Sequence, residues 1–237
     1  MNILIIGYGK MGKIIDELAQ QRGHNILARL TSKDKWNKDT LLQLKPDVAI
    51  EFTHPEAAVN NILQCFEANI PVVVGTTGWY QHLDTIISLC KQKNQSLLYA
   101  SNFSIGVNLF FKINDYVASL LKKYPEYNVS IIEAHHTQKK DAPSGTAISI
   151  AEQILNYYPS KKNWSIDKKN ESLHISVRRS ADEKGYHSVI YQSAIDEIQL
   201  SHHAFSRKGF ALGAILAAEF LKDKKGVFQM KDVLNNI

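Results

Sequence analysis

Hydrophobic positions in the first hundred residues alternate between short apolar runs and longer segments with helical spacing. The short runs, bounded by turn residues, predict strands at residues 2–6, 25–30, 47–52, 71–74 and 96–99. Apolar residues three and four positions apart predict helices at residues 10–21, 55–68 and 79–93. Strands that alternate with helices are typical of a parallel sheet with crossover helices. Residues 1–104 are therefore predicted to form a doubly wound α/β domain.

The pattern changes after about residue 104. Helices are predicted at residues 105–123, 144–157 and 207–222, and strands at residues 127–134, 173–178, 187–191 and 197–203. A Lys- and Asn-rich spacer over residues 161–171 shows no element. The last three strands are too close in sequence for crossover helices, so they are expected to be largely antiparallel. Residues 105–206 are thus expected to form a smaller α+β domain, and residues 207–237 to complete the first one.

Composition excludes several classes of protein. With 44% hydrophobic and 22% charged residues among 237, the chain is globular rather than disordered. No apolar run approaches the ~20 residues that cross a bilayer, and the N-terminus has no signal-peptide pattern, so no membrane association is expected. The two cysteines, Cys65 and Cys90, offer neither a disulfide framework nor a metal-ligand spacing, which suits the reducing cytoplasm.

The net charge of +5 is compatible with two kinds of partner, nucleic acid or a small anionic substrate. Nucleic acids are usually bound by basic residues gathered on one face together with aromatic side chains. The lysines of this chain are scattered, so no nucleic acid partner is expected. The charge therefore favours a small anionic ligand.

The first predicted strand leads directly into a glycine-rich turn. Residues 7–12 read Gly-Tyr-Gly-Lys-Met-Gly, a G-x-G-x-x-G pattern that opens a predicted helix. A dinucleotide needs glycines there because the turn is tight, the pyrophosphate approaches bare backbone, and the helix packs closely on the strand. Within a strand–turn–helix unit, this pattern favours a dinucleotide site over a purely structural turn.

The loop after the second predicted strand bears on the choice between NADH and NADPH. An NAD-selective site expects an acidic residue at the end of that strand. This chain has Thr31 and Ser32 there, with Arg29 and Lys33 nearby. Without a carboxylate to repel it, a 2′-phosphate would be attracted by these cations, which favours NADPH or the use of both cofactors. The same residues are equally compatible with a solvated basic loop.

The most informative segment is a polar loop before the predicted helix at residue 144. It places His135, His136, Lys139 and Lys140 within six residues. The segment Pro-Ser-Gly-Thr at residues 143–146 then begins the helix, where a hydroxyl can cap it and small residues leave the first N–H groups open. An anion, most naturally a substrate carboxylate, would dock there with lysine support.

Three interpretations of the histidine pair compete. Metal binding is disfavoured because no third ligand accompanies the two histidines, so no metal is expected. A structural role, in which each imidazole satisfies a local carbonyl group, stays open. General acid–base catalysis is favoured because imidazole titrates near neutral pH. With a hydride-carrying cofactor, it indicates reduction of a polarised, unsaturated centre in an anionic molecule. A serine hydrolase is excluded because the chain has no Gly-x-Ser-x-Gly elbow.

At this loop the sequence resembles the 4-hydroxy-tetrahydrodipicolinate reductases, also called dihydrodipicolinate reductases. The resemblance rests on Glu-Ala-His-His at residues 133–136, on Lys139, and on Asp-Ala-Pro-Ser-Gly-Thr-Ala at residues 141–147. Further matches follow in family order over nearly the whole chain. They are Glu-Phe-Thr-His-Pro-Glu at residues 51–56, Gly-Thr-Thr-Gly at 75–78, Ser-Asn-Phe-Ser at 101–104 and Phe-Gln-Met-Lys-Asp at 228–232.

The resemblance implies a Rossmann-like cofactor domain and an α+β domain that binds substrate and assembles a homotetramer. It implies that NADH or NADPH reduces the dehydrated form of 4-hydroxy-tetrahydrodipicolinate, a small dicarboxylate, in diaminopimelate and lysine biosynthesis. His135 would donate or accept a proton, and Lys139 would donate one. The residues implied to hold the substrate carboxylates are His136, Gly145 and Thr146. Together with Gly12 of the turn, the residues implied to line the cofactor are Gly7, Tyr8, Gly9, Lys10, Met11, Gly75, Thr76, Thr77, Ala100, Ser101, Asn102 and Phe103.

Two other functions stay open. Another oxidoreductase on the same two-domain plan, such as an imino-acid or semialdehyde dehydrogenase, is disfavoured because Lys139 and the turn at residues 143–146 suit a dicarboxylate. A non-catalytic cofactor sensor would be marked by the loss of His135 or Lys139, and both are present. His187 aligns with a histidine of the family, but no role is transferred to it.

Overall fold

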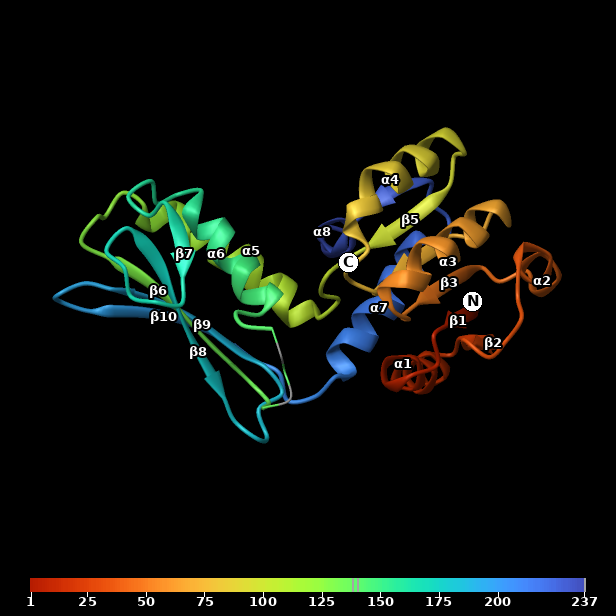
Figure 1. Cartoon of the computed structure of the whole chain (residues 1–237), viewed down its shortest axis with the longest axis horizontal. Helices are drawn as coiled ribbons and strands as arrows, with labels where there is room; N and C mark the ends of the chain where they lie inside the picture. Colours follow the sequence, from red (N-terminus) through yellow and green to blue (C-terminus); the bar gives the residue numbers. More distant parts are fainter. Residues whose placement is uncertain (138, 140, 237) are drawn as a thin grey trace. The chain divides into compact units, whose positions relative to one another are not determined.

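The computed structural model describes residues 1–137, 139 and 141–236, which form two compact units. The first unit combines Met1–Ile105 with the chain from Arg207 onwards, and the second comprises Gly106–Ser206. Figure 1 shows both units and labels most of their elements. Among the described residues, no helix has both the length and the apolar character needed to cross a bilayer.

A six-stranded, wholly parallel sheet with the order β11-β5-β4-β3-β1-β2 forms the centre of the first unit (Figure 1). Its strands are β1 (Asn2–Ile6), β2 (Asn25–Leu30), β3 (Val48–Glu51), β4 (Val72–Val74), β5 (Ser96–Tyr99) and β11 (Gly226–Phe228). Its helices are α1 (Lys10–Gln21), α2 (Lys38–Leu44), α3 (Pro55–Glu67), α4 (Leu83–Gln92), α7 (Lys208–Leu221) and α8 (Met230–Leu234), with a 3₁₀ turn at Tyr80–His82. The strand order reverses at β1, which has β2 on one side and β3 on the other.

Apolar side chains bury both faces of this sheet. Successive side chains of a strand point to opposite faces. On one face, Ile3 and Ile5 of β1 pack with residues of α1, α7 and α8. On the other face, Leu4 and Ile6 pack with residues of α2, α3 and α4. Helices therefore cover both faces, and the predicted doubly wound α/β fold is confirmed.

The helix α7 packs against the first unit although the second unit precedes it in the sequence. Its Glu219 pairs with Arg22 at 2.9 Å and with His24 at 2.7 Å. Its Gly213 approaches the loop after β5 so closely that a Cβ atom there would overlap the carbonyl oxygen of Phe103. The C-terminal segment therefore packs directly against the backbone of the loop after β5.

A five-stranded mixed sheet with the order β10-β9-β6-β8-β7 forms the second unit. Its strands are β6 (Asn128–His135), β7 (Asn163–Ser165), β8 (Ser172–Arg179), β9 (Tyr186–Gln192) and β10 (Glu197–His203). Two helices, α5 (Ile105–Leu121) and α6 (Gly145–Leu155), pack on it through apolar residues such as Phe110 and Ile150. The core of this unit therefore lies between these helices and the sheet.

The last three strands run largely antiparallel to one another, as expected, but one of them has a parallel neighbour. The hairpin of β9 and β10 is antiparallel, and so is the pair of β6 and β9. However, β8 pairs in parallel with β6 and with β7. The last three strands nevertheless alternate in direction as expected, since β8 is parallel to β6 and β9 is antiparallel to it. The crossover through α6 places β8 beside β6 rather than beside β9. The spacer over residues 161–171 contains β7, whose three residues are too few to show a pattern.

Candidate active site

The glycine-rich turn at the end of β1 combines tight packing with open space. Gly7 has φ +99°, a left-handed conformation that favours glycine, and a Cβ atom there would overlap the carbonyl oxygen of Phe52. A Cβ atom on Gly12 would overlap the carbonyl oxygen of Gly7. At Gly9, in contrast, a Cβ atom would meet nothing within 4 Å. The turn therefore leaves room over Gly9 for a pyrophosphate to approach the backbone.

The first turn of α1 suits an anion. Gly9 is the N-cap residue and provides no side-chain cap, and the turn has no acidic residue. Lys10 is exposed at the first helical position, whereas Met11 packs against the core of the sheet. Open N–H groups and the positive end of the helix dipole attract a phosphate. The hydroxyl of Tyr8 donates to Asp16 at 2.6 Å, which fixes this side chain beside the turn.

A cavity of about 390 Å³ lies beside this turn within the first unit. It is lined by Gly7 and Gly9, by residues 30–32 after β2, by Trp36, and by residues 52–54 after β3. Its volume is in the range of small-molecule sites. It also lies where the strand order reverses, which is where such sheets bind nucleotides. The residues present therefore fit a dinucleotide.

The loop after β2 differs from the sequence-based expectation. Thr31 does follow the end of the strand, but its N–H and its hydroxyl both donate to Asp34 Oδ2 at 2.7 Å. These hydrogen bonds hold the pKa of Asp34 below its usual value. Arg29, expected to be available to a 2′-phosphate, instead pairs with Asp16 at 2.5 Å. The turn thus brings the Asp34 carboxylate to the end of β2, where the sequence shows no acidic residue.

The loop after β4 lies at the same sheet edge as the glycine turn, because β1 and β4 belong to one parallel sheet. A Cβ atom on Gly75 would overlap the ring of Phe52. Thr76 is buried, and its Oγ1 accepts a hydrogen bond from Thr53 N at 2.7 Å. Thr77 is exposed. The segment after β3 thus joins the loop after β4 to the glycine turn.

The loop after β5 lies at this edge as well. Ala100 packs against the sheet core, and Ser101 is exposed. Asn102 Oδ1 accepts a hydrogen bond from Ser104 N at 2.9 Å. Phe103 is buried, with its ring centroid 5.7 Å from that of Phe52. All the predicted cofactor residues therefore lie at one edge of the first unit's sheet.

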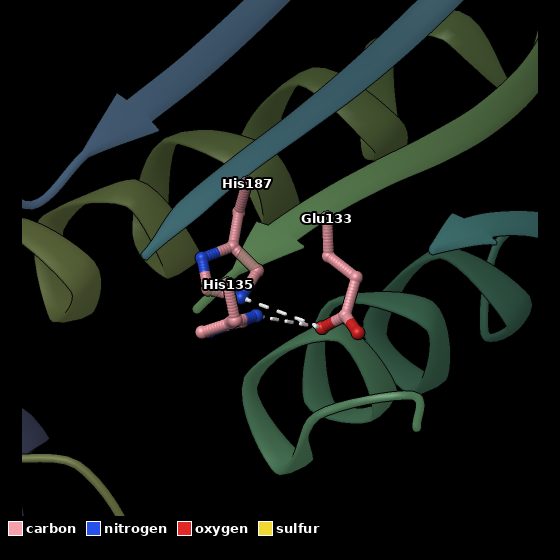
Figure 2. A group of neighbouring side chains, drawn as sticks. All are labelled: Glu133, His135 and His187. Carbon is pink, nitrogen blue, oxygen red and sulfur yellow. Dashed lines mark ion pairs between the residues drawn. The ribbon is translucent and has the colours of Figure 1, made fainter. Parts of the chain in front are cut away.

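A second group of polar side chains lies at one end of the second unit's sheet. The strand β6 ends at His135, and its alternating pattern buries His135 and Glu133 on the same face. In the pairing of β6 with β9, His187 lies opposite Glu133. In the pairing of β6 with β8, Arg179 lies opposite His135. The strand register therefore gathers these four residues, three of which Figure 2 shows.

Glu133 is the centre of this group. Its Oε2 lies 3.5 Å from His135 Nδ1 and 4.0 Å from His187 Nε2, the two contacts dashed in Figure 2. The same oxygen accepts a hydrogen bond from Ser144 N at 3.0 Å. Its Oε1 lies 3.3 Å from Arg179 Nη1. Both oxygens of the fully buried carboxylate thus have the partners that its burial requires.

Burial and charge act unequally on the two imidazoles. Burial lowers the pKa of His135, and the nearby Glu133 carboxylate opposes this shift, whereas Lys139 and Arg179 add to it. Burial lowers the pKa of His187 further, to about 3, with help from charge on His135. His187 is therefore neutral near pH 7. Of the two, His135 is the imidazole suited to exchange a proton.

Glu133, His135 and His187 also offer three ligand atoms within 4.8 Å of one another. The sequence-based case against a metal counted only the adjacent histidines and missed the ligand from β9. The carboxylate is nevertheless already paired with the Arg179 guanidinium and with the N–H of Ser144. A divalent ion would be repelled by that guanidinium, so the surroundings of the group do not favour a metal.

The N-terminus of α6 follows the histidine loop. Ser144 Oγ accepts a hydrogen bond from Ala147 N at 3.2 Å and shares another of 3.2 Å with His187 Nε2. Gly145 is exposed, and a Cβ atom there would meet nothing within 4 Å. Thr146 is half-buried, and the first turn has no acidic residue. This terminus therefore has the open backbone that an anion needs.

His136 and Lys139 lie between β6 and α6. The N–H of Lys139 donates to the carbonyl of His136 at 3.1 Å, and its ammonium pairs with Asp141 at 2.7 Å. This contact lowers the pKa of Asp141. His136 is half-buried, and its Nδ1 has no hydrogen-bond partner among the described residues. Lys140, which the sequence also offered as a cation, lies outside the described residues.

Comparisons with known proteins identify the family. Residues 1–103 match the family model described as the N-terminus of dihydrodipicolinate reductase, and residues 106–234 match that of its C-terminus. A 4-hydroxy-tetrahydrodipicolinate reductase from Christiangramia forsetii is 47% identical over 238 residues, which cover 100% of this chain and 99% of that protein. The chain belongs to the dihydrodipicolinate reductase family.

Two further proteins extend this likeness. A 4-hydroxy-tetrahydrodipicolinate reductase from Methanocaldococcus jannaschii is 35% identical over 239 residues, covering 97% of this chain and 80% of that protein. The solved dihydrodipicolinate reductase from Paenisporosarcina sp. TG-14 shares the fold, with a TM-score of 0.81 and 24% identity over 97% of both chains. As a member of the dihydrodipicolinate reductase family, the chain is an oxidoreductase of the NAD(P)H-dependent reduction step in diaminopimelate and lysine biosynthesis. The predicted family, fold class and reaction are therefore confirmed.

The sequence motifs do not assign a role to three residues of the histidine group. Glu133 was part of the family motif but received no role, and Arg179 and His187 received none either. The positions of Glu133 and His135, two apart on one strand, already place both side chains on one face. Arg179 and His187 carry no such signal, because the pairing of β8 and β9 with β6 brings them there.

Proposed function

We propose that the chain reduces the dehydrated form of 4-hydroxy-tetrahydrodipicolinate to tetrahydrodipicolinate with His135 and Lys139 as its proton-transferring groups. Reduction of a carbon double bond requires one hydride and one proton. When bound, the nicotinamide cofactor supplies the hydride. His135 ends a buried strand and contacts Glu133, which also accepts a hydrogen bond from Ser144 N before α6, and Lys139 lies in the loop between them. Two groups able to move a proton therefore lie near the helix end proposed to bind an anion. This juxtaposition carries the proposal.

The substrate carboxylates are proposed to bind at His136, Gly145 and Thr146. An exposed glycine at the start of α6 leaves backbone N–H groups accessible, and no acidic side chain lies in that turn to repel an anion. The related reductase from Paenisporosarcina sp. TG-14 was solved with dipicolinate, a planar dicarboxylate, bound to it. A ligand of this kind supports a dicarboxylate as the substrate.

The first unit is proposed to bind the cofactor through the three loops at its sheet edge. The open space over Gly9 and the cavity beside it support this assignment. Residues 1–104 and 207–237 would then be the dinucleotide-binding domain, and residues 105–206 the domain for substrate binding and assembly. The proposed residues are Gly7, Tyr8, Gly9, Lys10, Met11, Gly12, Gly75, Thr76, Thr77, Ala100, Ser101, Asn102 and Phe103.

A cytoplasmic homotetramer is the proposed state of the protein. Large apolar side chains are exposed along α5 of the second unit, among them Leu109, Ile113 and Tyr116. Exposed apolar surface of this kind is common where subunits meet. Both cysteines are buried free thiols, which supports a reducing compartment. Light scattering in solution would give a mass near four times 26.8 kDa for a tetramer, and any other multiple would refute this assembly.

Substitution of Lys139 tests the proposed chemistry. Lys139→Ala is expected to lower turnover by about 10²–10⁴-fold, as loss of a proton donor does, with little effect on cofactor affinity. Lys162→Ala is the matched control, because Lys162 also forms an ion pair on the surface, with Glu171 at 2.5 Å, but lies away from the histidines. A Lys139→Ala enzyme that keeps the turnover of Lys162→Ala would refute the role of Lys139.

A further inference from the structure

Glu133 is a buried carboxylate that the proposed chemistry does not use. It is 0% exposed, yet it contacts three charged or polar groups from β8, from the residue before α6 and from its own strand. It contacts Arg179 on β8, the N–H of Ser144 before α6, and His135 at the end of its own strand. An ionised carboxylate in such a site costs several kcal/mol unless its partners are well placed. This group is therefore tied to the positions of all three partners.

The contact of Glu133 with His135 bears on the orientation of the imidazole. A carboxylate beside one ring nitrogen favours the tautomer that carries its proton on that nitrogen and leaves the other free. Here the nitrogen is Nδ1, at 3.5 Å, so Nε2 is the nitrogen left without a proton. The distance is that of an ion pair, and catalytic hydrogen bonds often shorten only when substrate is bound.

His187 completes the surroundings of this imidazole. It is 4% exposed, and its ring meets that of His135 edge to face, with centroids 5.1 Å apart and planes at 70°. Its Nε2 shares a hydrogen bond with Ser144 Oγ, the cap of the helix proposed to bind a carboxylate. As a neutral group it holds both neighbours without adding charge to the site. Figure 2 shows His187 next to His135, with both rings directed toward the Glu133 carboxylate.

We propose that Glu133 and His187 are positioning residues that hold the His135 imidazole and the capped end of α6 in one fixed arrangement. Through Glu133 Oε2, the proton-carrying ring and the backbone of Ser144 share a single anchor. His187 contacts both the His135 ring and the Ser144 hydroxyl, and it therefore acts as a second anchor. The inference rests on the proposed function, in which His135 moves a proton and α6 binds a carboxylate.

Charge changes around His135 give this role a specific signature. The charged groups that face it are Glu133 on β6, Arg179 on β8, and Lys139 and Asp141 in the loop, with neutral His187 on β9. Glu133 raises the pKa of His135. Removing that charge while keeping the shape should therefore lower the pKa of His135 and release its ring.

The test compares Glu133→Gln and His187→Gln in the full-length enzyme, with His174→Gln as a matched control. His174 is a half-buried histidine on β8, paired with Ser130 rather than with the histidine group. Substrate is supplied by a coupled upstream synthase, and rates are expressed per NADH-binding site. Glu133→Gln is expected to lower kcat by about 10–100-fold, because the imidazole loses the carboxylate that fixes its tautomer and orientation. The limb of its pH–rate profile that belongs to His135 should move to lower pH.

His187→Gln is expected to lower kcat and also to raise the KM for substrate, since it loosens Ser144. A purely structural role would lower the melting temperature but leave kcat per binding site and the pH profile unchanged, which would overturn the proposal. If Glu133→Gln does not fold, the kcat and KM of His187→Gln alone decide between a positioning role and a purely structural role. The His135→Gln variant distinguishes a failure of the proposed function from a failure of the positioning role. An active His135→Gln enzyme refutes the proposed function, whereas an inactive one with normal Glu133→Gln and His187→Gln refutes only the positioning role.

Discussion

The Arg179 guanidinium lies 3.3 Å from the buried Glu133 carboxylate and donates through Nη2 to the carbonyl of Asp141 at 2.8 Å. One cation therefore both compensates the buried anion and holds the loop that contains Lys139. Arg179 is the last residue of β8, so the parallel pairing of β8 with β6 fixes where this cation lies. The architecture of the second sheet and the electrostatics of His135 are thereby linked.

Arg179→Gln should move the pKa of His135 in the direction opposite to that expected for Glu133→Gln. Arg179 lowers the pKa of His135, so its removal should raise that pKa. The variant should also lose about 3 kcal/mol of stability, because a buried carboxylate is left without its cation. Histidine NMR titration, with the His135 signal assigned by its loss in His135→Gln, measures the first effect, and urea unfolding measures the second. A pKa that falls or stays constant would contradict this electrostatic account.

Gly9→Ala and Gly12→Ala should separate cofactor binding from folding. A methyl group at Gly9 enters open space, so the protein should fold normally while its NADH affinity falls by about tenfold or more, since the backbone can no longer approach the pyrophosphate. A methyl group at Gly12 would overlap the carbonyl of Gly7, so this variant should lose stability. Fluorescence titration with NADH and thermal unfolding measure the two effects. Wild-type NADH affinity in Gly9→Ala would place the pyrophosphate elsewhere.

Asp34→Asn should shift cofactor use toward NADPH. The Asp34 carboxylate bonds to Thr31 at the strand end where a 2′-phosphate would lie, and its lowered pKa keeps it charged. Removing this charge should raise the kcat/KM ratio of NADPH over NADH by about 3–10-fold. Thr31→Glu, which adds a carboxylate, should shift the ratio toward NADH. Asp182→Asn, at an exposed carboxylate of the second unit, is the control. An unchanged ratio in both variants would show that this loop does not contact the ribose.

The free energy of unfolding should decrease as pH falls from about 6.5 toward 3. The folded-state pKa of His187 is lowered to about 3 by burial, so the unfolded chain takes up a proton that the folded protein rejects across this interval. In His187→Gln the slope should be shallower by up to about 1.4 kcal/mol per pH unit. Urea unfolding at several pH values tests this. Equal slopes in the two proteins would mean that His187 is protonated in the folded state.

Local sequence signals predicted the first unit well. The strands β1, β2 and β5 have the predicted bounds because each apolar run is ended by turn residues. The short elements α2, β11 and α8 were not predicted, since their three to seven residues are too few for a period to emerge. The pairing partner of β8 was also beyond local signals, because it depends on the crossover through α6.

In the candidate site, too, residues within one contiguous segment could be predicted, whereas residues brought together by the fold could not. Contiguous motifs indicated the glycine turn and the loop with His135 and Lys139, since each lies on one stretch of chain. Asp34 was missed because a turn, rather than the strand itself, brings its carboxylate to Thr31. Arg179 was missed, and His187 was noted without a role, because both reach Glu133 only through strand register. Motifs therefore identify the groups that do chemistry more readily than the groups that hold them.

The central claim is that this member of the dihydrodipicolinate reductase family reduces the product of the upstream synthase. The most direct test measures NADH and NADPH oxidation by the wild-type protein, with substrate generated in the same cuvette by that synthase. The account predicts oxidation of at least one nucleotide that depends strictly on the synthase and disappears in His135→Gln. Absence of oxidation with either nucleotide, in protein that still binds them, would contradict it and favour a cofactor sensor or a different imine substrate.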